Sequence, residues 1–274
     1  MSRTGSSNSW RELASKPLSS PHREEDTEGF YDREDSHYRA YWDKAGSLHW
    51  GVFDDRTGND FLKACANLSE IMARKSDLNE SSHVIDLGCG NGNTAMWLAQ
   101  SFGCRILGVD LSGVRVQAAI DGLDAAEPQL KQRVAFQKAS VTNLPLRDES
   151  FTHAWSQAAI YHVPDKAGAL REASRVLRSD GTFVFDDLIK PRPDTTDLAK
   201  QYVYDRLLFD TDYSFDSYQD ALAQAGFRVL EATDLSEHLA TSYTRLAELA
   251  REASDQGGEH FKALAFAYEQ MVTC

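Results

Sequence analysis

The feature that most constrains the fold is a glycine-rich turn between an apolar stretch and a helical one. Residues 84–93 read VIDLGCGNGN, with Asp86 inside the apolar stretch and Gly88, Gly90 and Gly92 at alternate positions. Glycines at this spacing allow a sharp turn and let a ligand approach the main chain closely. The helix that follows directs unpaired N–H groups and its positive dipole end to the same place. The pattern predicts a strand, a nucleotide-binding turn and a helix in succession.

The acid and the glycine spacing indicate which kind of ligand the turn accepts. Asp86 would repel a pyrophosphate so near the turn, whereas a carboxylate can pair with a ligand ammonium. Dinucleotide-binding turns have the spacing GxGxxG, but here the third glycine comes one residue earlier. Both observations disfavour a nicotinamide dinucleotide.

A second acid lies where a ribose would bind. Residues 105–109 read RILGV and predict the next strand, which Asp110 ends 20 residues after Gly90. In doubly wound folds a carboxylate at this distance accepts both ribose hydroxyls. The turn and Asp110 together predict a nucleoside site.

These segments resemble the class I, Rossmann-like S-adenosylmethionine-dependent methyltransferases, and the resemblance runs from about residue 30 to the end. It includes residues 140–146, 151–157, 165–176 and 181–187, which look like the adenine-side segment, the fourth strand, the following helix and the fifth strand. The nearest likeness is to enzymes that methylate sarcosine and dimethylglycine. The shared features are His49-Trp50-Gly51, Trp155-Ser156-Gln157 and a serine, Ser140, where many relatives carry Asp.

The order of elements predicts an α/β fold. Strands and helices alternate from His83 to about Asp187, which indicates a mostly parallel sheet with helices on both faces. We expect a disordered polar tail over residues 1–28 and a methyltransferase domain over residues 29–274. This domain divides into an aromatic N-terminal helical cap (29–80), a cofactor-binding core (81–190), and an insertion, strand and helical lid (191–274).

Within these parts, single elements are also predicted. Asp60 is expected to cap a helix that runs to about Arg74. Helices are expected over residues 194–209 and 217–225, a strand over 227–230, and two helices from Glu237 onward, separated at Gly257 and Gly258. The resemblance also implies a last antiparallel strand, which the sequence lacks at residues 271–274.

Composition narrows the function classes. The 274 residues include 29 basic and 42 acidic side chains, giving a net charge of −13, which argues against a nucleic-acid partner. No apolar run has the length of a membrane span or a signal peptide, and the four cysteines show no metal-ligand spacing. We expect a reduced, cytoplasmic protein without a metal, and the oligomeric state stays open.

The resemblance implies S-adenosylmethionine as cofactor and assigns residues to each of its parts. Asp86 and the backbone of the three glycines would hold the methionine end, and Asp110 the ribose. Leu111 and Val141 would flank the adenine, and Ser140 would face its amino group. Gln157, at the end of the fourth strand, completes the expected cofactor site.

The candidates on the substrate side are aromatic, histidine and acidic side chains. Tyr31, in the aromatic N-terminal segment, is expected to face the sulfonium or the methyl group. His162 and His49 are expected to accept a proton or to orient the substrate. The further expected substrate contacts are Trp50, Asp187 and Tyr243, whereas His153 is assigned to the core.

The preferred hypothesis is methyl transfer from S-adenosylmethionine to a small soluble metabolite, with an amine nitrogen of a glycine derivative as the favoured acceptor. The alternatives within the family are oxygen, sulfur and carbon acceptors in natural products, sulfur osmolytes, quinones or isoprenoids. A nicotinamide-dependent dehydrogenase and a non-catalytic cofactor-binding protein are the alternatives of other classes.

Overall fold

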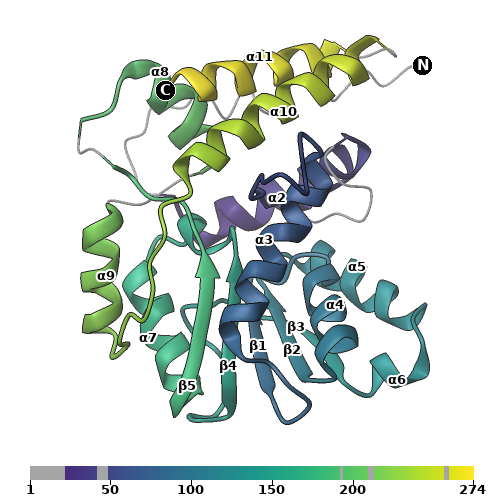
Figure 1. The fold of residues 1–274 in the computed structure, drawn as a ribbon, viewed down its shortest axis with the longest axis vertical. Coiled ribbons are helices and arrows are strands. Elements are labelled where there is room, and N and C mark those ends of the chain that lie inside the picture. Colours follow the sequence, from purple (N-terminus) through teal and green to yellow (C-terminus); the bar gives the residue numbers. More distant parts are fainter. Residues whose placement is uncertain (1–21, 42–48, 192–193, 209–212, 256–258) are drawn as a thin grey trace.

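The structure is a computed structural model that describes residues 22–41, 49–191, 194–208, 213–255 and 259–274. Its centre is a five-stranded sheet in the order β3-β2-β1-β4-β5, in which every neighbouring pair is parallel (Figure 1). The predicted α/β fold with a parallel sheet is therefore confirmed. The strands are β1 (His83–Leu87), β2 (Arg105–Asp110), β3 (Val134–Lys138), β4 (Phe151–Gln157) and β5 (Leu177–Asp186).

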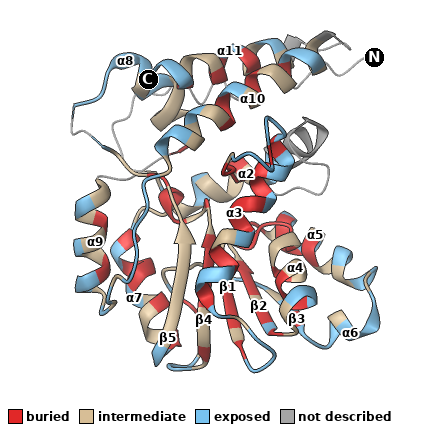
Figure 2. Cartoon of the chain, in the orientation of Figure 1, coloured by how far each residue is buried: buried red, intermediate tan, exposed pale blue. Residues whose placement is uncertain are grey.

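Helices cover both faces of the sheet because the central strand is apolar on both sides. Val84 packs with apolar side chains of α3 (Phe61–Ser76) and α4 (Asn93–Phe102) on one face. Ile85 and Leu87 pack with α7 (Lys166–Val176) on the other. Figure 2 shows buried residues concentrated along β1, β4 and the helices facing them. The remaining helices of the core are α5 (Gly113–Asp124), α6 (Pro128–Lys131) and α9 (Phe215–Gln224).

Side-chain caps fix where the helices begin, as the polar residue before each start suggests. Asp60 accepts a hydrogen bond from the Lys63 N–H at the start of α3, which confirms the predicted cap. Ser112 caps α5 and Asp165 caps α7 in the same way. Each cap satisfies an N–H group that would otherwise lack a partner in the first turn.

A helical lid lies over the carboxyl ends of the strands (Figure 1). It consists of the hairpin of α10 (Ser236–Asp255) and α11 (Glu259–Thr273) with α8 (Asp197–Ala199) and a π-helical turn, Lys200–Asp205. The expected pair of C-terminal helices is present, while Gly257 and Gly258 lie outside the described residues. The core of the lid includes Tyr243, Leu246 and Tyr268, which pack with Trp50 and Tyr161.

The N-terminal helix α2 (Glu24–Tyr41) begins before the boundary expected at residue 28. Residues 1–21 of the expected tail lie outside the described part of the chain. Glu24, Glu25 and Asp26 stand in the first turn of α2, where negative charge interacts favourably with the helix dipole. Part of the polar segment that was expected to form a disordered tail is therefore the start of a helix.

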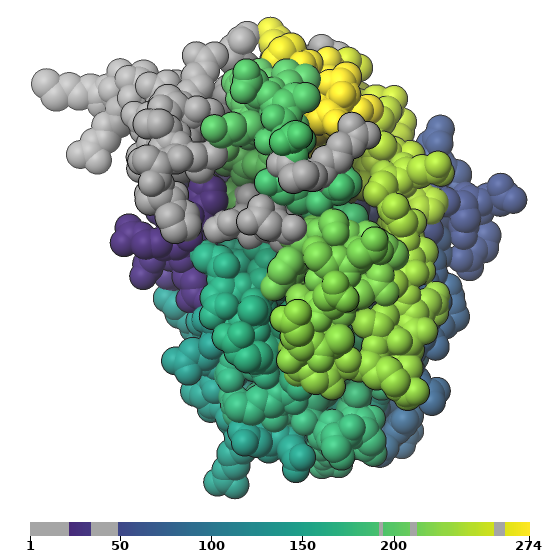
Figure 3. All heavy atoms as spheres, turned by 90° about the vertical axis from the view of Figure 1, so that its left-hand side faces the viewer, coloured from purple at the N-terminus to yellow at the C-terminus, as the bar shows by residue number. Residues whose placement is uncertain are grey.

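The strand expected at residues 227–230 is not formed, and this prediction was wrong. Phe227 packs against Phe183 of β5, but Leu230 is 75% exposed and the segment does not pair with the sheet. A strand next to β5 needs a ladder of main-chain hydrogen bonds, and here only side chains make the contact. Figure 3 shows this yellow-green segment and α9 covering one side of the core.

The loop with His49, Trp50 and Gly51 is clamped between α3 and α10. The Gly51 N–H donates to the Ser242 hydroxyl, and the Val52 N–H donates to the Ala64 carbonyl. A Cβ atom on Gly51 would lie 2.5 Å from the Ala64 carbonyl carbon and 2.7 Å from the Cys65 nitrogen. The glycine is therefore required for the backbone of this loop to approach α3.

No helix in the described ranges is long and apolar enough to cross a membrane.

We expect Gly51→Ala to lower the free energy of unfolding by about 1–3 kcal/mol, because the added methyl group must displace backbone atoms of α3. Urea denaturation of the purified variant measures the change. Gly122→Ala, inside helix α5, is the matched control, because the added Cβ would lie in ordinary contact, 3.6 Å from the Met96 Cε. This control should raise the stability by about 0.5–1 kcal/mol. Equal effects of the two substitutions would contradict the steric explanation.

Candidate functional site

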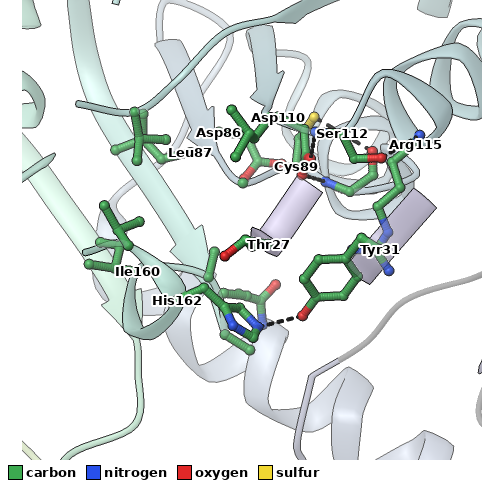
Figure 4. A pocket seen from close by; sticks show the side chains of 18 of the residues that line it. Thr27, Tyr31, Asp86, Leu87, Cys89, Asp110, Ser112, Arg115, Ile160 and His162 are labelled. Atoms are coloured by element: carbon green, nitrogen blue, oxygen red, sulfur yellow. Dashed lines mark hydrogen bonds between the residues drawn. The ribbon is translucent and has the colours of Figure 1, made fainter. Parts of the chain in front are cut away.

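A cavity opens at the carboxyl ends of the central strands, where parallel sheets bind their ligands. Eleven of the residues predicted for the site line it together: Tyr31, His49, Asp86, Gly88, Gly90, Asp110, Leu111, Ser140, Val141, Gln157 and His162. Strands β1, β2 and β4 end at this cavity, and α2 closes one side. Figure 4 shows side chains from these elements converging on one space.

The glycine turn is held in place by Asp110. Its carboxylate oxygens accept hydrogen bonds from the Gly90 N–H at 2.8 Å and the Ser112 N–H at 2.9 Å. Gly88 and Gly90 have positive φ angles of 79° and 53°. A Cβ on Gly88 would lie 2.4 Å from the Ala159 Cβ, so this glycine also lets the segment after β4 approach the turn.

Gly92, also expected at the cofactor, does not line the cavity. A Cβ at this position would lie 2.4 Å from the ring of Phe136 and 2.9 Å from Ala119. The glycine precedes the first residue of α4 and has a φ angle of 77°. A glycine is needed at this position because the turn packs closely against β3 and α5.

Asp86 is a buried acid, and one of its oxygens has no hydrogen-bond partner in the described part of the chain. It is 2% exposed, and its Oδ2 makes no hydrogen bond to any residue that the structure describes. Burial, with a smaller contribution from the charge of Asp110, raises the pKa of Asp86 to about 7. A cationic partner in the cavity would restore the ordinary ionisation of this group.

Gln157 lies between the strands and α3 with its side-chain amide fixed from several directions. Its Oε1 accepts hydrogen bonds from the Trp155 indole at 3.2 Å and from the Thr94 hydroxyl at 3.3 Å. Its Nε2 donates to the Ser69 hydroxyl at 3.2 Å. These partners hold the amide at the cavity wall.

His162 and Tyr31 meet across the cavity, as Figure 4 shows. The Tyr31 hydroxyl lies 2.5 Å from the His162 Nε2, and the two rings pack edge to face with centroids 5.2 Å apart. Burial lowers the pKa of His162 to about 3, so the imidazole is neutral at physiological pH. The Arg115 guanidinium carbon stands 4.2 Å from the Tyr31 ring centroid, and burial raises the pKa of the phenol.

His49 has a defined tautomer. Its Nδ1 lies 2.9 Å from the Trp50 carbonyl oxygen. Because a carbonyl only accepts, this nitrogen must carry the hydrogen. The ring of His49 is thereby oriented at the cavity wall.

Three predicted substrate residues lie outside the cavity lining. Trp50 and Tyr243 are buried in the lid core, with ring centroids 6.3 Å apart. Asp187 accepts hydrogen bonds from the Tyr161 N–H and the Tyr218 hydroxyl, both at 2.8 Å. Burial raises the pKa of Asp187 to about 7, and that of its neighbour Asp186 to about 8. Asp187 thus holds the Ile160–His162 turn and α9 together behind the cavity.

The sequence analysis missed most of the cavity wall that α2 forms. Helix α2 contributes Glu24, Thr27 and Glu28 as well as Tyr31, and the spacing of these positions is that of one helix face. This spacing was a usable signal within the segment assigned to the disordered tail. The other lining residues that were not predicted are Leu87, Cys89, Asn91, Asn93, Thr94, Ser112, Arg115, Ala139, Trp155, Ala158, Ala159, Ile160 and Val163.

Comparison with known proteins identifies the family. A family model described as "Methyltransferase domain" matches residues 85–185. The chain is 30% identical to 27-O-demethylrifamycin SV methyltransferase of Amycolatopsis mediterranei, over 80% of each chain. It is also 30% identical to glycine/sarcosine/dimethylglycine N-methyltransferase of Actinopolyspora halophila, over 85% of this chain and 42% of that protein.

A solved structure has the same fold. Geranyl diphosphate C-methyltransferase from Streptomyces coelicolor A3(2), crystallised with S-adenosyl-L-homocysteine, superposes with a TM-score of 0.73 at 17% identity, over 94% of this chain and 95% of that one. With its parallel sheet, its glycine turn, and acids within β1 and at the end of β2, the chain belongs to the class I S-adenosylmethionine-dependent methyltransferases.

Proposed function

We propose that this enzyme methylates a hydroxyl oxygen of a small molecule and that His162 accepts the hydroxyl proton. The observation that carries this proposal is the contact between the neutral His162 imidazole and the Tyr31 hydroxyl at the cavity wall. Both residues line the cavity, and this contact supports the binding of an acceptor hydroxyl at Nε2. An acceptor hydroxyl that replaces or joins Tyr31 there would be hydrogen-bonded to a base.

The cavity fits S-adenosylmethionine at its amino-acid end. The ligand ammonium would pair with Asp86, whose Oδ2 has no partner among the described residues. The main chain of Gly88 and Gly90 can approach the same end of the ligand, and Gln157 presents a fixed amide beside it. When bound, the cofactor supplies a methyl group on a sulfonium sulfur, which a nucleophile displaces in line.

The nucleoside end is also accommodated. Each oxygen of Asp110 already accepts one backbone N–H and retains a lone pair for a ribose hydroxyl. Leu111 and Val141 offer apolar contacts to a base, with Ser140 at the edge. These groups bind and orient the cofactor, and orientation is the main requirement of a displacement reaction.

His162 would take the proton without building up charge in the cavity. In the proposed transfer the acceptor oxygen would bond to the methyl group as the bond from methyl to sulfur breaks, and the hydroxyl proton would move to the His162 Nε2. One positive charge is lost at sulfur as one appears on the imidazole. A buried histidine that resists protonation in the free protein can thus serve as a base during transfer.

The other predicted residues act at the walls in this proposal. The Tyr31 ring packs edge to face against His162 and would hold it in place. Arg115 in turn stacks on the Tyr31 ring. His49 is oriented through the Trp50 carbonyl and faces the acceptor. Trp50 packs against Tyr161, next to His162, and Tyr243 packs against Trp50; both would contact an acceptor that extends toward the lid.

An amine of a glycine derivative is the second candidate acceptor, and the similarity to a sarcosine-methylating enzyme favours it. The expectation that Asp187 contacts the substrate loses support, because its two oxygens are engaged by Tyr161 and Tyr218. The similarity to a rifamycin O-methyltransferase supports the hydroxyl acceptor.

The affinity for S-adenosylhomocysteine should fall about tenfold between pH 8 and pH 6. An ammonium pairs with ionised Asp86, and a carboxyl with a pKa of about 7 is mostly protonated at pH 6 and mostly ionised at pH 8. Calorimetry across this range measures the dependence. Asp86→Asn should bind weakly and without the tenfold change, and a wild-type affinity that is constant with pH would contradict the ammonium assignment.

His162→Ala should lower kcat/KM for a hydroxyl acceptor by about 10²- to 10⁴-fold, because the proton loses its acceptor. Its Kd for S-adenosylhomocysteine should stay within about twofold, since the cofactor contacts are elsewhere. The measurement uses labelled cofactor with a panel of phenols, alcohols, thiols, isoprenoids and glycine derivatives.

His153→Ala is the control for the loss of a histidine outside the cavity. The His153 Nε2 lies 2.9 Å from the Ser76 carbonyl oxygen, so this variant should lose stability but keep its activity per folded molecule. Transfer to glycine derivatives alone would overturn the hydroxyl proposal, and an unchanged kcat/KM in His162→Ala would overturn the role of His162.

A further inference from the structure

Helix α2 presents one face to the cofactor cavity. Glu24, Thr27, Glu28 and Tyr31 stand at positions i, i+3, i+4 and i+7, and all four line the cavity. Figure 4 shows Thr27 and Tyr31 of this face directed into the space. The Thr27 hydroxyl is buried and has no hydrogen-bond partner among the described residues.

The two ends of this face touch opposite ends of the cavity. Tyr31 meets His162, which follows β4. Glu24 lies seven residues before Tyr31 on the same helix. Its Oε1 accepts hydrogen bonds from the Ser140 hydroxyl at 2.6 Å and the Thr142 hydroxyl at 3.0 Å. Ser140 and Thr142 follow β3, so α2 crosses the cavity from the β3 side to the β4 side.

The strand order identifies the end that Glu24 occupies. The sheet order β3-β2-β1-β4 places Asp86 on β1, Asp110 at the end of β2, and Ser140 beyond β3. A ligand whose amino-acid end pairs with Asp86 and whose ribose binds Asp110 therefore has its base beside Ser140. This step rests on the proposed cofactor placement.

Glu24 has the chemistry that the amino edge of adenine requires. The exocyclic amine of adenine donates hydrogen bonds, so its partner must accept. The hydroxyls of Ser140 and Thr142 both donate to Glu24 Oε1, while Oε2 makes no hydrogen bond to a described residue. We propose that Glu24 is the residue that recognises the adenine amino group, and that the two hydroxyls orient its carboxylate for this purpose.

The neighbouring acids on α2 serve as an internal comparison. Glu25 and Asp26 are exposed and do not line the cavity, so the helix dipole accounts for them. Glu24 is partly buried and points into the cavity instead. Further contacts hold α2 there, because the Ser112 hydroxyl donates to Asp32 at 2.5 Å and Lys138 forms an ion pair with Glu28.

Recognition of the base by α2 links the two halves of the site. The helix that carries Glu24 also carries Tyr31, which positions the His162 ring. A nucleoside with the correct base therefore favours the position of α2 in which His162 is held at the acceptor side. The wrong base would lose both the hydrogen bond and this support.

The test compares S-adenosylhomocysteine with S-inosylhomocysteine, in which a carbonyl oxygen replaces the adenine amino group. We expect the wild type to bind the adenosyl compound at least about tenfold more tightly, because a carboxylate cannot pair with the carbonyl. Glu24→Gln offers an amide that can donate to this oxygen, and the preference should fall to about twofold or reverse. Calorimetry measures both affinities, and their ratio cancels any general change in the position of α2.

Glu25→Gln removes the same charge one residue away and should leave the ratio unchanged. A wild type that prefers adenosyl and a Glu24→Gln variant with the same preference would overturn the role of Glu24 while leaving the proposed function intact. An equal loss of affinity for both compounds in Glu24→Gln would also overturn the role of Glu24. A wild type that binds neither compound would overturn the proposed cofactor site itself.

Discussion

The hydrogen bonds of Asp110 hold the site together. One carboxylate fixes the glycine turn after β1 through the Gly90 N–H and the start of α5 through the Ser112 N–H. Two consecutive β-α units are thereby joined at the edge of the sheet where ligands bind. The same arrangement leaves Asp86 buried next to a second negative charge. The free protein therefore carries an electrostatic cost that a cationic ligand relieves.

The proposed acceptor side and the proposed cofactor side consist of different kinds of chemical groups. In the proposed site, backbone and carboxylate groups at fixed strand ends would bind the parts of the cofactor, whereas aromatic rings from separate segments form the wall around His162. Such a wall excludes water and selects by shape more than by charge. Because its residues come from α2, the loop at Trp50 and the lid, substitutions there can change the acceptor without disturbing the sheet.

The parts that sequence alone predicted are those determined by local patterns. The strands at Val84 and Ile106, the turn at Gly88 and the cap at Asp60 each follow from residues close together in the chain. The contribution of α2 was missed because acidic residues in a first helical turn resemble a polar tail in composition. Asp187 could not be distinguished from a ligand-facing acid, since its partner Tyr218 comes from a helix that approaches only in the folded chain.

The segment between α9 and α10 connects the lid to the core without joining the sheet. Within the described chain, residues 228–234 form no main-chain hydrogen bonds with β5, and side chains attach the segment through the Lys75–Glu231 ion pair and the packing of Val229 and Leu235. Displacing this connector breaks side-chain contacts but leaves the ladder of β5 intact. A shift of this connector would therefore leave the pairing of β4 with β5 undisturbed, while the lid stays packed on Tyr161 and Leu188 beyond the strand ends.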